Sequence, residues 1–164
     1  VTTRAMTHYL LQCTQITDMQ RVLFVDQQHP DAVDYLSTLT LIGLKEHFGQ
    51  QCSPLFPAPW TYRDCAGDVS HLYGRGFGTT RLLDPNLRAD NELSGSTAEL
   101  RYQDFDTLVI GSISRNTELA KELARYFEPD RTIWIHGEDT PPLAENVRTY
   151  RQAGAHLFVR SIDV

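Results

Sequence analysis

Apolar runs divide the chain into short strands, and a helical pattern follows most of them. The most regular unit begins at Thr107–Ile110, whose β-branched and aliphatic residues precede Gly111, and its helical pattern starts at Thr117. An apolar run without alternation is typical of a strand that is buried on both faces, as in a parallel sheet. The pattern therefore predicts a strand, a turn and a helix in succession.

The same patterns recur along the chain. Further strands are predicted over residues 21–26, 51–56, 132–136 and 155–159. Helices are predicted over residues 32–48, 117–127 and from Pro141 to about Gly154. Asp31 is placed to cap the first helix and Gly49 to end it, while Thr140 is placed to cap the last. The buried stripe of the last helix is expected to consist of Leu143, Val147 and Tyr150.

Successive strand–helix units predict an α/β fold, a single Rossmann-like three-layer domain with a mostly parallel sheet of about five strands. Two strand orders, 3-2-1-4-5 and 2-1-3-4-5, fit the pattern equally well. We assign the domain to residues 19–164, with a long irregular insertion over residues 58–101 that carries function or short helices, one of them within 93–102. Residues 1–18 either pack on the domain or form an N-terminal extension, and we assign them as an extension.

Composition and charge limit the function classes. The net charge of -6 at pH 7 argues against a general nucleic-acid binder, whose surface would be basic. Three cysteines form no CxxC pair, the start of the chain does not have the pattern of a secretory signal, and no apolar run is long enough to span a membrane. We therefore expect a cytoplasmic protein without a membrane span.

Several motifs of known chemistry are missing from the sequence. It contains no HExxH motif, no Cys or His metal-ligand set and no GxSxG nucleophile elbow, and we expect neither a metal nor a cofactor. A phosphoacceptor receiver domain would have the same sheet topology. That class is rejected because Gly111 stands where its third strand should end in Asp.

Polar residues follow several of the predicted strands. The carboxyl ends of parallel strands meet at one edge of a sheet, which is where open α/β sheets bind ligands. Carboxylates and imidazoles there could act as general acids or bases, and amides at a helix start could hold an anion. The candidates at this edge are Asp26, His29, Gly111, Ser112, Ser114, Arg115, His136, Glu138 and Asp139.

A glycine-rich loop lies within the irregular insertion. Tyr73, Gly74, Arg75, Gly76 and Phe77 alternate glycines with aromatic and basic residues. Such a loop can bring backbone amides close to a phosphate or a sugar, with an aromatic ring stacked on the ligand. It is not a P-loop, because no Gly-Lys-Ser/Thr follows it, and it is not the dinucleotide fingerprint, because it does not directly follow the first strand. A tight structural turn explains the glycines equally well.

Four stretches together resemble a known family. They are Asp34–Leu36, Leu72–Phe77 (LYGRGF), Phe105–Ile113 (FDTLVIGSI) and Ile135–Asp139 (IHGED). The set resembles the amino-terminal half of bacterial family-1-type or CgeB-like glycosyltransferases, with their YGKGF or YGRGF, DLIIYGSI and DGEDD motifs. The similarity covers residues 19–163. The sequence departs from the pattern with His136 in place of the first Asp, and with Thr140 and two prolines after Asp139.

The resemblance implies the first of two Rossmann-like domains in a GT-B glycosyltransferase, whose carboxy-terminal domain holds most of the nucleotide-sugar. The expected function is to bind a sugar acceptor or a nucleotide-sugar, with a partner carboxy-terminal domain needed for catalysis. Glu138 and Asp139 would then be the catalytic base or would recognise sugar hydroxyls. Ser112, Ser114 and Arg115 would contact an anion.

Two other functions fit the sequence. The chain could be a non-catalytic interaction module that self-associates as a homodimer or covers a partner, through exposed aromatic residues of the insertion. These residues are Trp60, Tyr62, Tyr73 and Phe77. The chain could also be a small stand-alone enzyme that acts on glycosidic bonds through Glu138 or Asp139.

Overall fold

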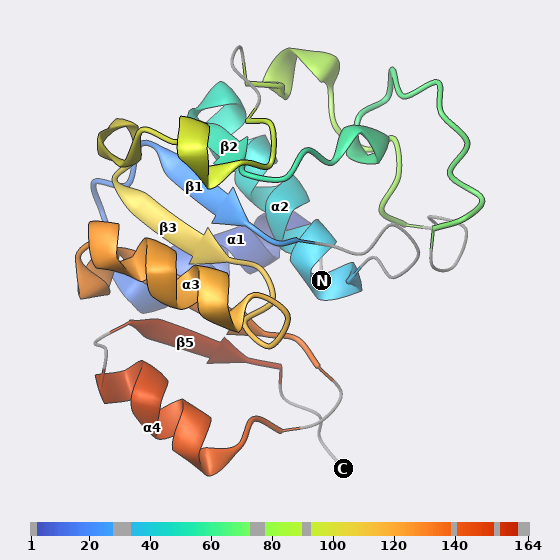
Figure 1. Ribbon diagram of the computed structural model, residues 1–164. Coiled ribbons are helices and arrows are strands. Elements are labelled where there is room, and N and C mark those ends of the chain that lie inside the picture. Colours follow the sequence, from blue (N-terminus) through green and yellow to red (C-terminus); the bar gives the residue numbers. More distant parts are fainter. Residues whose placement is uncertain are drawn as a thin grey trace.

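A five-stranded sheet with only parallel strand pairs forms the centre of the computed structural model, which describes residues 3–27, 34–72, 78–89, 93–138, 141–152 and 155–160 (Figure 1). The strands are β1 (Val22–Val25), β2 (Cys52–Pro54), β3 (Thr107–Ile110), β4 (Thr132–His136) and β5 (His156–Val159). Their order is β2-β1-β3-β4-β5. The α/β prediction is confirmed, and of the two strand orders the structure has 2-1-3-4-5.

The burial of the strands explains their composition. Every residue of β1, β3 and β4 is buried, as expected for strands covered on both faces. The edge strand β2 contains Pro54, which has no N–H to donate and is tolerated at the edge of a sheet. The other edge strand, β5, is only half-buried.

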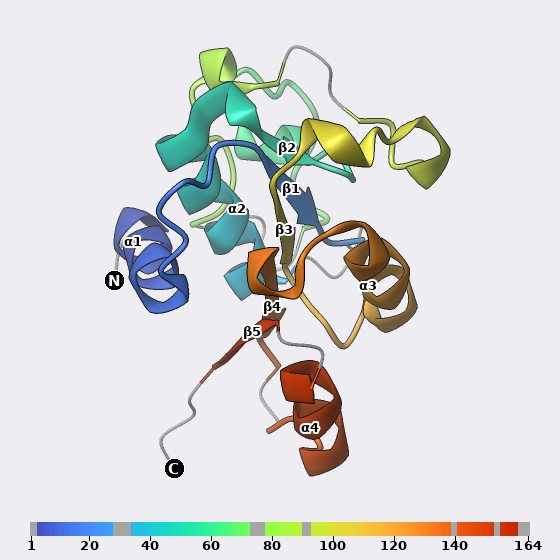
Figure 2. The ribbon, with the colours of Figure 1, turned by 90° about the vertical axis from the view of Figure 1, so that its left-hand side faces the viewer.

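Helices cover the two faces of the sheet. They are α1 (Thr3–Thr14), α2 (Tyr35–Phe48), α3 (Thr117–Leu123) and α4 (Ala144–Gln152). Figure 2 shows α1 and α2 on one side of the strands and α3 and α4 on the other. Successive side chains of a strand point to opposite faces of the sheet, so Leu23 and Phe24 belong to two separate core clusters. No helix in the described part of the chain has the length and apolar character needed to cross a membrane.

The observed helix ends correct two predictions. The N-cap of α2 is Asp34, whose Oδ1 accepts a hydrogen bond of 2.7 Å from the Ser37 backbone N–H; Asp31, the predicted cap, lies outside the described residues. Gly49 follows the last residue of α2, as predicted. Helix α4 begins at Ala144 instead of Pro141, because Pro142 disfavours the helical conformation of the residue before it.

The buried stripe of α4 is narrower than predicted. Tyr150 is 5% exposed and packs edge-on against Trp134, with ring centroids 4.5 Å apart. Leu143 lies before the helix and is 63% exposed, so its inclusion in the stripe was wrong. Thr140, the predicted cap, lies outside the described residues.

The irregular insertion contains short 3-10 helices and packs on α2. Among the described residues these helices cover 59–61, 85–87 and 97–99, and the third confirms the short helix expected within 93–102. A further 3-10 helix over residues 102–104 follows the insertion. Tyr62 is buried beneath the Arg88 guanidinium, which lies 4.4 Å from the ring centroid. The Lys45 ammonium reaches from α2 to the Leu87 carbonyl at 2.9 Å. These contacts fix the described part of the insertion to the domain.

Helix α1 packs directly on α2. Leu10 of α1 joins the core cluster of that face, and the two helices approach closely at Gly43. A Cβ atom at Gly43 would lie 2.5 Å from the Thr3 carbonyl oxygen and would also collide with Thr7 Oγ1. The glycine therefore permits the close contact between the helices.

We expect Gly43→Ala to lower the free energy of unfolding by about 1–2 kcal/mol, because overpacking should outweigh the better helix propensity of alanine. Urea denaturation measures the change. The matched control is Gly67→Ala, since Gly67 is exposed and its added Cβ would meet only Cys65 Sγ at 3.8 Å. Equal stabilities of the two variants would contradict the tight packing of α1 on α2.

Candidate functional site

The strand order reverses at the carboxyl ends of β1 and β3. The chain leaves β1 towards β2 on one side and leaves β3 towards β4 on the other, and sheets of this order bind ligands at the point of reversal. Asp26 follows β1 and Gly111 follows β3. The Gly111 N–H donates to the Val25 carbonyl at 2.9 Å and holds the two strand ends together.

Asp26 is a buried carboxylate with three side-chain donors. Its Oδ2 accepts from Ser37 Oγ at 2.5 Å and from Arg115 Nη2 at 2.9 Å. Its Oδ1 accepts from Asn116 Nδ2 at 2.8 Å. A buried carboxylate is tolerated only where such donors replace its hydration. Asp26 therefore orders the surrounding side chains as well as supplying charge.

Asn116 joins the loops after β1 and β3. Its side-chain Oδ1 accepts from the Gln27 N–H at 2.9 Å, and its Nδ2 donates to the Ser112 carbonyl at 2.7 Å as well as to Asp26. This residue was not among the site residues predicted from sequence. An Asn just before a predicted helix suggests an N-cap, but this side chain makes no capping hydrogen bond and serves the two loops instead.

Arg115 is bound by two carboxylates. Its Nη2 contacts Asp26, and its Nη1 lies 3.3 Å from Asp34 Oδ2, so both terminal nitrogens face negative charge. The side chain of Arg115 is 31% exposed. Burial raises the pKa of Asp34, and the nearby charges of Asp26 and Glu138 add to that rise, while the Ser37 N–H and the Arg115 charge oppose it. The charge of Arg115 is thus already shared within the site.

Glu138 gathers the hydroxyl groups of the site. Its Oε1 accepts from Ser112 Oγ at 3.0 Å and from Ser114 Oγ, so the predicted Ser112, Ser114 and Glu138 do lie together. The His136 Nδ1 lies 2.9 Å from Glu138 Oε2, a charge contact when the imidazole is protonated. That oxygen is buried, and apart from this contact it has no hydrogen-bond partner in the described part of the chain. Glu138 itself is partly open, with 27% of its side chain exposed.

Gly111 has a packing role at this edge. A Cβ atom there would lie 2.5 Å from Phe24 Cζ and closer still to Ser37 Oγ. Glycine therefore lets the loop after β3 lie directly against β1 and the first turn of α2. The loop that carries Ser112 and Ser114 therefore starts beside Asp26, whose Cβ would lie 3.2 Å from the added atom.

A small cavity adjoins Asp26 on the side of the insertion. Its volume is about 40 Å³, and it is lined by Phe24, Asp26, Leu41, Phe56, Pro57, Ala58 and Trp60. Trp60 is half-buried and its Nε1 is buried without a hydrogen-bond partner among the described residues, while Tyr62 is only 2% exposed. These two aromatic residues therefore do not form the exposed patch that an interaction module would need.

The other predicted site residues lie outside the described residues. These are His29, Asp139 and the loop of Tyr73, Gly74, Arg75, Gly76 and Phe77. In the ranges that are described, no group of three His, Cys, Asp or Glu residues could hold a metal ion.

Comparisons of the chain with protein-family models, with curated proteins and with solved structures find no match.

Asp34→Asn tests the electrostatics of this edge. Asparagine caps a helix as well as aspartate does but stays neutral. In the folded protein the pKa of Asp34 is raised above its unfolded value of about 3.9. The protonated carboxyl therefore stabilises the folded state at pH values below the unfolded pKa. This stabilisation is lost as the pH rises through the folded-state pKa. We therefore expect native protein to lose stability relative to Asp34→Asn as pH rises.

Urea denaturation of both proteins between pH 3 and pH 7 measures this difference. Asp34→Ala is the control for the cap, and should be less stable than Asp34→Asn by about 1 kcal/mol at every pH. A stability difference between native protein and Asp34→Asn that does not change with pH would contradict the raised pKa.

Proposed function

We propose that the chain is a glycosyltransferase-like domain of the GT-B amino-terminal type, and that it binds a hydroxyl-rich ligand at the carboxyl edge of β1, β3 and β4. The ligand would be a sugar acceptor or the sugar part of a nucleotide-sugar. The observation that carries the proposal is the cluster in which one oxygen of Glu138 accepts from both Ser112 and Ser114. Its two serines follow β3, one of the two strands between which the strand order reverses and where such sheets bind ligands.

The chemistry of this cluster suits sugar hydroxyls. A sugar hydroxyl both donates and accepts hydrogen bonds. Glu138 offers a partly exposed carboxylate acceptor, and the two serine hydroxyls can donate or accept. A sugar could therefore replace the contacts that Ser112 and Ser114 now make with Glu138 without leaving a buried group unpaired.

The charge balance favours the neutral part of a ligand over a phosphate. The Arg115 guanidinium already contacts the carboxylates of Asp26 and Asp34, and the charge of Glu138 lies near enough to add to the raised pKa of Asp34. A free phosphate here would meet unshared negative charge. The anion contact expected for Arg115 would require it to leave Asp34, so a diphosphate would have to be held by other residues of this chain or by a partner domain.

Glu138 is the proposed base of a transfer reaction. A general base must lie within hydrogen-bond reach of the proton that it removes, and Glu138 already accepts from two hydroxyls in this position. It would accept the proton of an acceptor hydroxyl whose oxygen forms a bond to the anomeric carbon of the donor sugar. The nucleoside diphosphate would leave with the electrons of the broken bond, and a carboxy-terminal partner domain would hold this nucleotide-sugar donor. Asp139 stays a candidate for the same role from sequence alone.

A thermal-shift screen of simple sugars, nucleotides and nucleotide-sugars tests the proposal, because a ligand that binds only the folded protein raises the unfolding temperature. We expect a sugar or a nucleotide-sugar to bind. Glu138→Gln should weaken its binding by about ten- to a hundredfold, the range for losing hydrogen bonds to a charged group.

Glu145→Gln is the matched control, because Glu145 is exposed on α4 and should leave binding unchanged. Far-ultraviolet circular dichroism establishes that both variants are folded. Equal affinity of Glu138→Gln and native protein would remove Glu138 from the site. Binding of inorganic phosphate but of no sugar would reject the hydroxyl-binding function.

The non-catalytic interaction module is the second proposal. It would require an exposed aromatic surface, and burial of Tyr62 and half-burial of Trp60 weaken the support for that surface. Of the four aromatic residues predicted for that surface, Tyr73 and Phe77 lie outside the described residues, so their part in it stays a prediction.

A further inference from the structure

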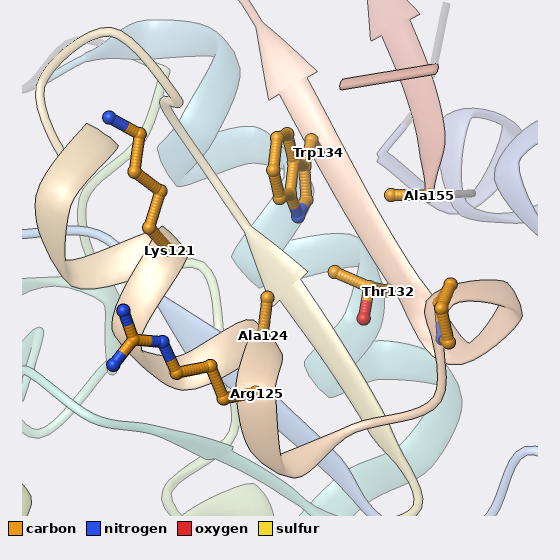
Figure 3. Close-up of a pocket in the computed structure, with 7 residues that line it drawn as sticks. Lys121, Ala124, Arg125, Thr132, Trp134 and Ala155 are labelled. Carbon is orange, nitrogen blue, oxygen red and sulfur yellow. The ribbon is translucent and has the colours of Figure 1, made fainter. Parts of the chain in front are cut away.

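A second cavity lies at the opposite end of β4 from Glu138. Its volume is about 170 Å³, and it opens between the last turn of α3 and the start of β4 and β5 (Figure 3). The walls include Lys121, Ala124 and Arg125 from the α3 region, Thr132 and Trp134 from β4, and Ala155. None of these residues contributes to the site around Asp26 and Glu138.

The walls of this cavity are mainly carbon. Figure 3 shows the charged ends of Lys121 and Arg125 extending away from Trp134, so that their aliphatic parts border the cavity. The Lys121 ammonium is bound to Glu118 at 2.9 Å. The Thr132 hydroxyl donates to the Glu128 carbonyl at 3.2 Å. The polar groups of Lys121 and Thr132 are thus hydrogen-bonded, and that of Arg125 extends away from the cavity.

The indole N–H of Trp134 is the exception. Trp134 is 3% exposed, and its Nε1 is buried without a hydrogen-bond partner among the described residues. In Figure 3 this nitrogen lies on the edge of the ring that faces Ala124 and Thr132, two residues that line the cavity. Buried donors without an acceptor are rare in folded proteins because leaving them unpaired is unfavourable. The wall of the cavity therefore contains one buried donor that has no partner among the described residues, in an apolar setting.

We propose that this cavity binds a small, uncharged ring molecule that carries one acceptor oxygen. The oxygen accepts from Trp134 Nε1, and the ring packs against Ala124, Pro129 and Ala155. The size is suitable, because an engineered apolar cavity of about 150 Å³ in another protein holds benzene. The site is independent of the proposed sugar function.

A matched pair of probes separates the hydrogen bond from apolar packing. Cyclohexanone has a carbonyl oxygen, and methylenecyclohexane has nearly the same shape without an acceptor. The chain contains 2 tryptophans, so the nitrogen–proton correlation spectrum has one indole signal from Trp134 and one from Trp60. Trp134→Phe assigns these signals by removing one of them.

We expect cyclohexanone to shift the Trp134 indole signal saturably and to leave that of Trp60 in place. Trp134→Phe should bind cyclohexanone about three- to tenfold more weakly, as expected for one neutral hydrogen bond, and should bind methylenecyclohexane as native protein does. The absence of a saturable shift would overturn the proposal. Equal cyclohexanone affinities of native protein and Trp134→Phe would also overturn it.

Filling the cavity provides a second test. Ala124→Leu should abolish binding of both probes, whereas Ala144→Leu, a control at an exposed position of α4, should retain it. Retained binding by a folded Ala124→Leu variant would place the ligand elsewhere and overturn the proposal. If Ala124→Leu does not fold, Ala155→Leu fills the same cavity from the start of β5 and decides in its place.

Discussion

The buried carboxylate of Asp26 is the constraint on which the carboxyl edge of the sheet depends. An isolated charge at this depth would be strongly unfavourable, so its neighbours must supply donors. They come from two segments far apart in the chain: Ser37 from α2, and Arg115 and Asn116 from the loop after β3. Satisfying one carboxylate therefore fixes that loop against α2. The loop in turn positions the serine hydroxyls beside Glu138.

Because Arg115 contacts two carboxylates, its charge is not free for a ligand, and this edge differs from that of many α/β sheets. Many such sheets present free cationic or amide donors to a phosphate at the strand ends. Here the guanidinium lies between Asp26 and Asp34, and the described groups next along the edge are Glu138 and the hydroxyls of Ser112 and Ser114. The proposed hydroxyl-rich ligand would therefore be recognised by hydrogen bonds with defined directions, which discriminate between the positions of hydroxyl groups on a ring better than charge does.

Local patterns predicted the strands well, and the site only in part. The strand over residues 132–136 was predicted with its observed bounds, because an uninterrupted apolar run is typical of a strand that is buried on both faces. The N-cap was predicted at Asp31, whereas the structure has it at Asp34. Both residues are aspartates, which favour this position equally, and only the geometry of the turn distinguishes them. Asn116 was missed because its function depends on Gln27, 89 residues away in the sequence. No local pattern contains such a partner.

The bridge formed by Asn116 has a consequence for how the edge responds to acid. A side-chain amide does not titrate in the range where proteins fold, unlike the carboxylates and the imidazole around it. Its bonds to the Gln27 N–H and the Ser112 carbonyl therefore do not depend on the proton concentration. The spacing of the two loops thus rests partly on two hydrogen bonds without formal charge, next to the contact that the same amide makes with the Asp26 carboxylate.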